Sequence, residues 1–282
     1  MQELIVENYG SINADFKCKK LTIIEGKEKE TILRLLYLFQ KTASKIKADS
    51  DLDKLSVNFW KNWKRLGLSQ SEGFIQWKSN SVEITVKDEA VKFTVHDEEI
   101  DKKAIFLPKS RIYTFEYTKK ENKDEIFLDF LDEKIVDTIV EAIREDNRST
   151  IIGGELAVEY GIFYFNDGGG FEDLMDLPEF YHKVLPTEYL FNYVTYRDKV
   201  IFLEKFGVEN TFDEKFEALT KQLLQICKNT QVIMTLNNPS LIDFINDPIT
   251  IGNKIGLLTM LETKLFTETL YLYENEVSQI YI

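Results

Sequence analysis

Cysteine is nearly absent from the chain, whose 282 residues include only Cys18 and Cys227. With no second Cys near either one, the sequence lacks the spacing of a zinc site or a redox motif. Both are expected to be buried or incidental thiols, which suits a reducing cytoplasm. Histidine is equally scarce. His96 and His182 stand alone, without H-x-x-x-H spacing, so no metal centre is predicted.

Long apolar runs and prolines are also lacking. No apolar run approaches the ~20 residues that span a bilayer, and residues 1–9 alternate like a strand rather than forming a signal peptide. We therefore expect a soluble, cytoplasmic protein without a membrane partner. Only 5 prolines stand against 20 Phe and 13 Tyr. The chain thus has few obligatory breaks and many residues suited to strands.

Positive charge is in deficit, because 35 Lys and Arg face 48 Asp and Glu, a formal net charge of −13. The resulting field repels phosphate backbones and anionic membranes. The basic runs at residues 17–20 and 102–103 are short and have acids nearby. We expect no direct nucleic-acid binding by the isolated chain.

Apolar runs of strand length alternate with stretches of helical periodicity, which favours an α/β fold. Strands are predicted near residues 4–6, 21–24, 74–77, 82–86, 91–95, 104–107, 151–165, 200–203, 232–234 and 270–273. Helices are predicted near residues 31–40, 41–66, 126–145, 188–196, 213–228 and 257–266. The purely apolar run at 200–203 suits a strand buried on both faces of a parallel sheet.

The opening segment, LIVENYGSINADFKCKKLTIIEGKEKETILRLLYLF, resembles the start of ABC-type ATPase heads. Such heads occur in SMC-like proteins, OLD-family proteins and related AAA-labelled bacterial ATPases. The resemblance implies a P-loop NTPase-like mixed sheet with flanking helices, as one head-like domain over residues 1–282. Residues 41–103 would form a small inserted α+β lobe in place of coiled-coil arms.

The phosphate loop of that family is degenerate here. The pattern G-x-x-x-x-G-K-[ST] needs a second Gly and a Lys directly before its hydroxyl residue. Only KEKE separates Gly26 from Thr31, and neither Lys27 nor Lys29 directly precedes a Ser or Thr. The loop's glutamates would put carboxylates where the family places phosphate. We interpret the segment as a tight exposed turn that caps a helix at Thr31.

The later motifs are altered as well. In KVIFLEKF, which resembles the Walker B strand, Glu204 stands at the Asp position that holds Mg²⁺, and Lys205 replaces the catalytic Glu. In VIMTLNNPSLIDFIN, Asn237 replaces the switch His. Where the family has its signature before a helix, only Glu188, preceded by Thr187, resembles it. AIFLPKSRIY keeps the Pro and Arg of a further family strand.

These alterations favour a pseudo-ATPase without a cofactor, a binding or scaffolding subunit that works with a protein partner. That partner would be a second copy or an ATPase subunit, and the resemblance implies a bacterial defence or mobile-element setting. A second hypothesis is a subunit that binds ATP and Mg²⁺ through Glu204 and becomes active only with a partner. A third is metal-dependent hydrolysis by the acidic run at residues 97–101, which also fits a solvated turn. Lys205 and its acidic neighbours fit an interface cluster or a solvated edge.

Overall fold

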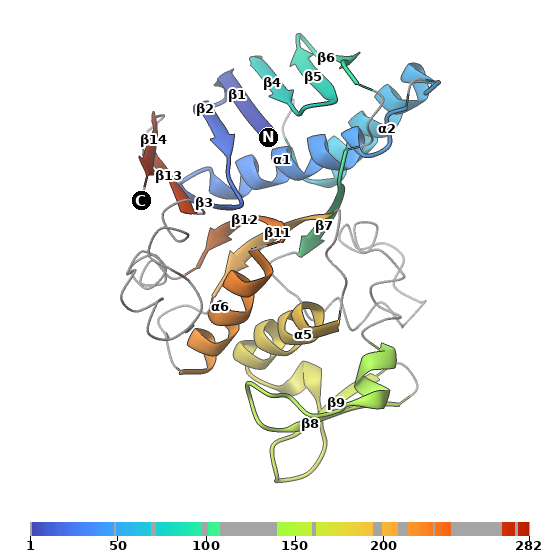
Figure 1. Ribbon diagram of the computed structural model, residues 1–282, viewed down its shortest axis with the longest axis vertical. Helices are drawn as coiled ribbons and strands as arrows, with labels where there is room; N and C mark the ends of the chain where they lie inside the picture. Colours follow the sequence, from blue (N-terminus) through green and yellow to red (C-terminus); the bar gives the residue numbers. More distant parts are fainter. Residues whose placement is uncertain are drawn as a thin grey trace.

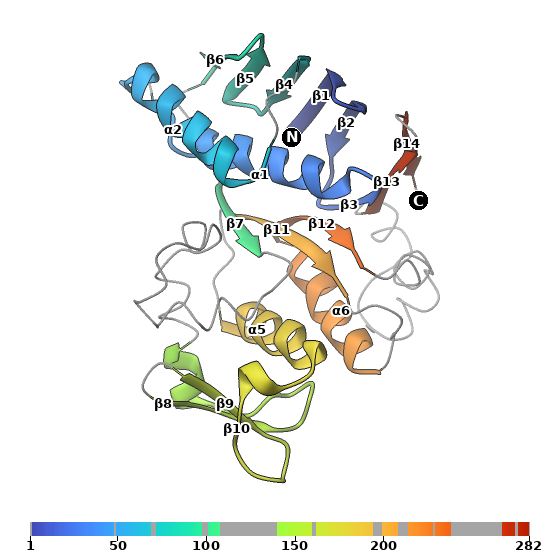
Figure 2. The ribbon, with the colours of Figure 1, turned by 180° about the vertical axis from the view of Figure 1, so that it is seen from behind.

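The computed structural model describes residues 2–47, 49–68, 72–97, 101–107, 140–159, 162–193, 199–207, 214–227, 229–237, 267–273 and 276–281. Its elements are stacked in layers, as Figures 1 and 2 show from opposite sides. An antiparallel sheet covers one side of helix α1 (Lys29–Ala43), and a mostly parallel sheet covers the other. Helices α5 (Glu179–Tyr193) and α6 (Glu214–Cys227) lie beyond the parallel sheet.

The antiparallel sheet has the strand order β2-β1-β4-β5-β6. Its members are β1 (Gln2–Tyr9), β2 (Ile12–Cys18), β4 (Phe74–Lys78), β5 (Val82–Lys87) and β6 (Ala90–Val95). Side chains of β2 alternate strictly between buried and exposed, as expected when one face packs on α1 and the other faces solvent. Within residues 41–103, expected as an inserted lobe, strands β4, β5 and β6 continue the N-terminal sheet, because β4 pairs directly with β1.

The second sheet has the order β14-β13-β3-β12-β11-β7. It comprises β3 (Leu21–Gly26), β7 (Lys103–Leu107), β11 (Lys199–Phe206), β12 (Gln231–Leu236), β13 (Thr267–Tyr273) and β14 (Glu276–Tyr281). All neighbouring pairs are parallel except β13 and β14. The run at 200–203 is fully buried in β11, which confirms that it forms a strand covered on both faces.

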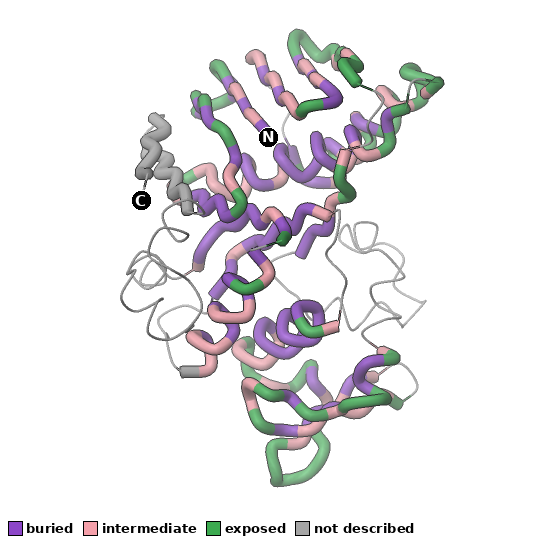
Figure 3. Tube along the Cα trace, viewed as in Figure 1, coloured by how far each residue is buried: buried purple, intermediate pink, exposed green. Residues whose placement is uncertain are grey.

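The core divides at this parallel sheet, because successive strand residues point to opposite faces. In β11, Val200 and Phe202 pack with α1, whereas Ile201 and Leu203 pack with α5 and α6. Tyr37 of α1 contacts Phe202 edge to face at 5.6 Å. Figure 3 shows buried residues concentrated along α1 and these central strands. Helix α1 is thus held between two sheets.

The helices differ in extent from the sequence expectation. The predicted helix at 41–66 is interrupted, since α1 ends at Ala43 and α2 spans Leu52–Arg65, where Asp51 accepts a hydrogen bond from the Lys54 amide. The helix expected at 188–196 begins at Glu179 and passes through Pro186. Of the helix expected at 126–145, only residues 140–145 are described, and they are helical. The helix expected at 257–266 lies outside the described residues.

A small third sheet, β10-β9-β8, lies beyond α5. It contains β8 (Glu155–Glu159), β9 (Ile162–Asn166) and β10 (Glu172–Asp173), followed by the short 3₁₀ turn Leu174–Asp176. Gly168, Gly169 and Gly170 join β9 to β10, and their amides donate to Asn166 and Asp167 side chains. This glycine run is therefore a hairpin turn between β9 and β10.

Both cysteines are buried thiols that form no disulfide. Burial raises the pKa of Cys227 to about 12, so its thiol stays protonated near neutral pH. Among the described helices, none is long and apolar enough to cross a bilayer. Within the described residues no cluster of His, Cys, Asp and Glu has the arrangement of a metal site.

Candidate functional site

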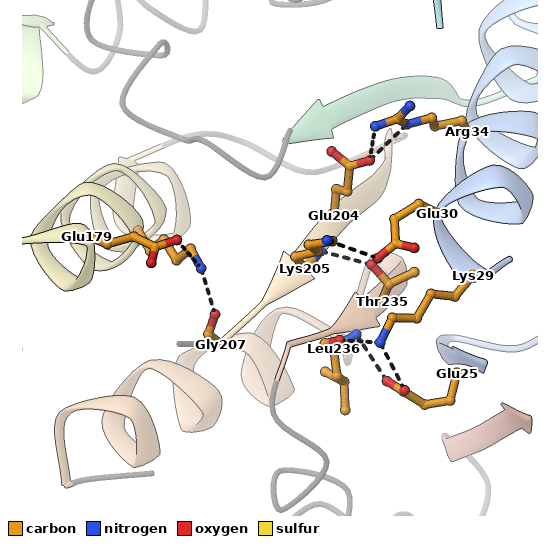
Figure 4. A network of polar contacts seen from close by, with 11 residues as sticks. Glu25, Lys29, Glu30, Arg34, Glu179, Glu204, Lys205, Gly207, Thr235 and Leu236 are labelled. Atoms are coloured by element: carbon orange, nitrogen blue, oxygen red, sulfur yellow. Dashed lines mark hydrogen bonds and ion pairs between the residues drawn. The ribbon is translucent and has the colours of Figure 1, made fainter. Parts of the chain in front are cut away.

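The carboxyl ends of β3, β12 and β11 lie side by side, because the three strands are parallel neighbours. This edge brings together Gly26, Glu204, Lys205 and Asn237, and Figure 4 shows its polar contacts. In open α/β sheets, ligands bind at the edge outside the carboxyl ends of the strands. The sheet edge is therefore the candidate site.

The turn between β3 and α1 differs from the predicted cap at Thr31. Helix α1 begins at Lys29, and its first backbone bond runs from the Ile32 amide to the Glu28 carbonyl at 3.1 Å. The Thr31 hydroxyl donates to the Glu28 carboxylate at 3.2 Å, so Thr31 supports the first turn instead of capping it. Only Lys27 and Glu28 connect strand and helix, and of the two only Lys27 is exposed. So short a connection lacks the length and the second glycine with which the pattern G-x-x-x-x-G-K-[ST] wraps a phosphate.

Lys29 is partly buried and is held by two acceptors. Its Nζ donates to the Glu25 carboxylate at 3.1 Å and to the Leu236 carbonyl at 2.6 Å. The other oxygen of Glu25 accepts from the Leu236 amide at 3.2 Å, which closes a ring of contacts between β3, α1 and β12. Burial raises the pKa of Glu25, although the Lys29 ammonium opposes that shift. Both hydrogen-bonded charges are therefore engaged in joining the strand ends.

Glu204 is paired with Arg34, a residue that the sequence analysis did not single out. Arg34 Nε and a terminal nitrogen lie 2.8 Å and 2.6 Å from the same Glu204 oxygen, and Glu204 is only 1% exposed. The other terminal guanidinium nitrogen donates to the Leu66 carbonyl at 3.1 Å. A buried carboxylate requires such a partner. The sequence signal was an arginine inside the apolar run ILRLLYLF.

Lys205 occupies a left-handed backbone conformation, with φ of 51°, at a bulge in β11. Its amide donates to the Thr235 hydroxyl at 2.8 Å, and its Nζ lies 3.8 Å from Glu30 Oε1. For a residue with a Cβ this conformation costs about 1–2 kcal/mol. The bulge thus places the Lys205 side chain at the sheet edge, in a strained backbone conformation.

Two polar atoms at the edge are buried without a hydrogen bond among the described residues: Glu30 Oε1 and Asn237 Nδ2. The Asn237 backbone amide is satisfied, because it donates to the Phe206 carbonyl at 2.9 Å. A buried unsatisfied donor or acceptor is uncommon in native structures and costs stability. The contacts around Glu30 and Asn237 are therefore less complete than those around Glu25 and Glu204.

A second lysine that sequence reasoning missed joins α5 to this region. Lys183 is 2% exposed, and its Nζ lies 2.8 Å from Glu179 and 3.4 Å from the Gly207 carbonyl. Gly207 directly follows β11, so the contact fixes α5 against the end of that strand (Figure 4). Helical spacing of Glu179 and Lys183 was the sequence signal for this pair.

Thr187 and Glu188, predicted as signature-like, take structural roles. The Thr187 hydroxyl donates to the Lys183 carbonyl within α5 at 2.6 Å. The buried Glu188 carboxylate accepts from the Ser149 and Thr150 hydroxyls and from the Thr150 and Ile151 amides, at 2.6–3.1 Å. This carboxylate therefore anchors the loop before β8, and its signature-like role stays a prediction.

Several residues of the other motifs lie in parts of the chain that the structure does not describe. Pro108, Arg111 and residues 239–246 lie outside the described residues, as do Glu98 and Glu99 of the acidic run. Asp101, the last residue of that run, accepts a hydrogen bond from the Ser79 hydroxyl at 2.6 Å. His182 contacts the Leu174 carbonyl at 2.8 Å, and His96 lies 3.7 Å from Glu83.

No protein-family model matches the chain, and no curated protein matches it in sequence. Among solved structures, the chain is similar to an SMC head bound to the C-terminal winged-helix domain of ScpA, with TM-score 0.47, 10% identity, and coverage of 99% of this chain and 97% of that one. An SMC head domain with an extended coiled coil, bound to the C-terminal domain of ScpA from Pyrococcus furiosus, gives TM-score 0.47 and 8% identity over 100% and 96%.

A third similar structure is Stu0660 of Streptococcus thermophilus, with TM-score 0.41, 15% identity, and coverage of 99% and 76%. At these scores the likenesses carry no functional inference. The mixed α/β fold itself follows from the described strands and helices, with an antiparallel and a mostly parallel sheet on either side of α1.

Proposed function

We propose that this chain is a pseudo-ATPase with a head-like fold, a binding or scaffolding subunit without nucleotide chemistry of its own. The observation that carries the proposal is that basic and acidic side chains at the sheet edge form ion pairs with each other. Three cations there each pair with an acid of the same chain: Lys29 with Glu25, Arg34 with Glu204, and Lys205 with Glu30.

Each step of ATP hydrolysis would need one of these groups. A phosphate requires a lysine and free backbone amides, but Lys29 is bound to Glu25 and Leu236. Mg²⁺ requires an available carboxylate, but Glu204 is buried against Arg34. A general base beside it would have to be Lys205, and an ammonium group cannot accept a proton. The pairs therefore support a site without catalysis.

The first prediction is that the purified chain does not bind ATP. Calorimetry with ATP and Mg²⁺ should show only dilution heat, corresponding to a dissociation constant above about 1 mM. Micromolar binding, about −8 kcal/mol, would contradict the proposal. If a nucleotide-dependent thermal shift occurred and disappeared in Glu204→Ala, it would favour the second hypothesis, an ATP-binding subunit completed by a partner.

The second prediction concerns the partner surface at the sheet edge. The Lys205 side chain is 31% exposed and that of Glu30 is 24% exposed, so both residues reach the surface although Glu30 Oε1 itself is buried. Lys205→Glu would place like charges together, and we expect association to weaken several-fold, mainly through a slower on-rate with altered salt dependence. Light scattering would detect self-association, and pull-downs from the host would detect another subunit.

Lys205→Gly is the matched control, because it removes the side chain and relieves the left-handed strain. It should fold at least as stably as the parent, since a partly exposed ion pair contributes about 0–1 kcal/mol and the strain costs a similar amount. Its loss of association should be smaller than that of Lys205→Glu. A monomer at all concentrations, with no host partner sensitive to Lys205→Glu, would contradict the interaction role.

A further inference from the structure

Strand β6 lies at one border of the antiparallel sheet, because among the described strands only β5 pairs with it. The two-residue turn at 88–89 makes Lys87 and Ala90 a hydrogen-bonded pair, and such pairs recur at every second residue of an antiparallel ladder. The His96 amide agrees with this spacing, since it donates to the Ser81 carbonyl, directly before β5, at 2.7 Å. Even-numbered residues of β6 thus use their backbone groups for β5. Outward-pointing amides and carbonyls belong to the odd-numbered residues Val91, Phe93 and Val95.

Helix α2 crosses one face of this sheet and continues past β6. Trp63, near the end of α2, contacts Tyr9 of β1, with ring centroids 5.8 Å apart. One turn earlier, Phe59 contacts Phe93 of β6, with ring centroids 6.3 Å apart. Followed back toward its first residue, the helix therefore runs from β1 to β6. Both views of the ribbon show the start of α2 projecting beyond β6 (Figures 1 and 2).

The projecting turns of α2 present apolar side chains at the place where a further strand would lie. Leu55 and Leu52 share one side of the helix with Phe59, and at about 1.5 Å per residue they lie about 6 Å and 10 Å beyond it. Neighbouring strands are about 4.8 Å apart. Leu52 is 46% exposed, and Val95 at the end of β6 is 41% exposed. We call the outward backbone of β6, together with Leu52 and Leu55, the β6 slot.

The solvent-facing side of β6 carries positive charge near its middle. Lys92 pairs across the ladder with Thr85, and Lys87 lies diagonally from Lys92 on the same face. Both lysines are exposed, and within the described residues neither forms an ion pair. The acids Glu89 and Asp97 stand just beyond the two ends of β6. An acidic residue opposite Lys92 on an added strand would therefore be favoured.

We propose that the β6 slot binds an extended segment of a partner protein as an added antiparallel strand. The segment would place apolar side chains toward α2 and an acidic side chain opposite Lys92. In this mode of recognition, backbone hydrogen bonds supply affinity, and side chains at alternate positions supply specificity. The slot shares no residue with the sheet edge, so the proposal can fail without affecting the proposed function.

A second copy of the chain fits the slot less well than a single extended segment. Two β6 strands paired about a twofold axis would place the projecting start of each α2 across the other copy's β6. That copy's own α2 already packs on the same face of its β6, through Phe59 and Phe93. A lone strand brings no helix with it, and one strand width is what the projecting turn provides.

The test titrates the full chain with the heptapeptide TVEVEVT, blocked at both ends, which matches residues 90–96 of β6 position by position. Its valines would face α2, and its glutamates would lie on the same side as Lys92. Calorimetry should show saturable binding with a dissociation constant below about 1 mM. TVKVKVT should bind at least about fivefold more weakly, because its lysines repel Lys92. In NMR spectra, the amides of Val91, Phe93 and Val95 should exchange more slowly when TVEVEVT is bound.

Two methylated peptides test whether the backbone makes the contact. In an added antiparallel strand, the valine amides of TVEVEVT point toward β6 and the glutamate amides point away. N-methylation of the valines should therefore weaken binding by about tenfold or more, since the hydrogen-bond donors are lost. N-methylation of the glutamates should leave the affinity within about threefold of that of TVEVEVT.

Protein variants locate the contact on the chain. Val95→Pro removes an amide that points away from β5, a change that a border strand tolerates. It should therefore keep the parental melting temperature within a few degrees but weaken TVEVEVT binding by about fivefold or more. Val95→Thr, which retains the amide and a β-branched side chain, should bind within about twofold of the parent.

A second pair of variants tests the apolar side chains of α2. Leu52→Gln should weaken TVEVEVT binding by about threefold or more, because a polar amide replaces part of the apolar surface of the slot. Val57→Gln makes a similar change at a residue that is 69% exposed but lies on the side of α2 opposite Phe59. Val57→Gln should bind like the parent.

Three results would overturn the proposal. One is the absence of saturable binding of TVEVEVT to the parent chain. Another is equal binding of the two methylated peptides, or parental affinity in Val95→Pro, because either would show that no strand is added to β6. The third is self-association of the parent chain that light scattering detects and Val95→Pro abolishes, which would assign the slot to a second copy.

Discussion

Arg34→Met is expected to lower the free energy of unfolding by about 3–5 kcal/mol. The substitution keeps an unbranched side chain of helical propensity in α1 but leaves Glu204 as a buried carboxylate without its cation. The Leu66 carbonyl also loses its guanidinium donor. Urea denaturation followed by circular dichroism would measure the loss.

Two companion variants show whether the charge pair causes this effect. Arg34→Met/Glu204→Leu should recover most of the lost stability, because buried ion pairs can be replaced by apolar residues at little cost. Arg34→Lys should fall between Arg34→Met and the parent, since an ammonium group lacks the fork that contacts both Glu204 and Leu66. If Arg34→Met costs less than about 1 kcal/mol, the pair is solvated in solution and its assigned role at the sheet edge is wrong.

Glu188→Ala is expected to have a comparable effect, about 3 kcal/mol or more, because four donors, of which the Ser149 hydroxyl is buried, lose their acceptor at once. The Thr150 and Ile151 amides should exchange their hydrogens faster, since both donate to this carboxylate in the parent. Equilibrium denaturation measures the first effect, and amide hydrogen exchange by NMR measures the second.

Glu188→Gln tests the same contacts with a smaller chemical change. It retains one acceptor oxygen, so the loss should be about half that of Glu188→Ala, with partial protection of the two amides. The exposed Glu145→Ala provides a neighbouring control and should change stability by no more than about 0.5 kcal/mol. A Glu188→Ala variant with parental stability and parental exchange rates would show that this carboxylate does not anchor the loop.

The central parallel strands were predictable because a strand buried on both faces has an uninterrupted run of apolar residues. Residues 200–203 and 232–234 are uninterrupted apolar runs, and both form central strands. The alternation in residues 4–6 likewise reflects one packed face and one solvated face. Burial of this kind is a local property of a strand, so it can be read without knowing its neighbours.

The features that were missed depend on contacts between distant residues. Nothing local to β4 reveals that it pairs with β1, and nothing local to Glu204 reveals Arg34 as its partner. The early start of α5 was missed because Pro186 normally marks a helix boundary, yet here the helix passes through it. Sequence patterns predict each helix or strand by itself, whereas the assembled core determines which strands and side chains pair with each other.

The central position of β3 sets an order for assembly during synthesis. Its neighbours β12 and β13 are made much later, whereas β1, β2, β4, β5 and β6 are all complete by residue 95. The antiparallel sheet can therefore form from strands within the first 95 residues while the unpaired backbone edges of the apolar strand β3 still await their partners. Non-local parallel pairing is slow, and unpaired strand edges promote aggregation. Folding intermediates of this chain should thus expose β3, and a chaperone that shields apolar strands with unpaired edges would act at that stage.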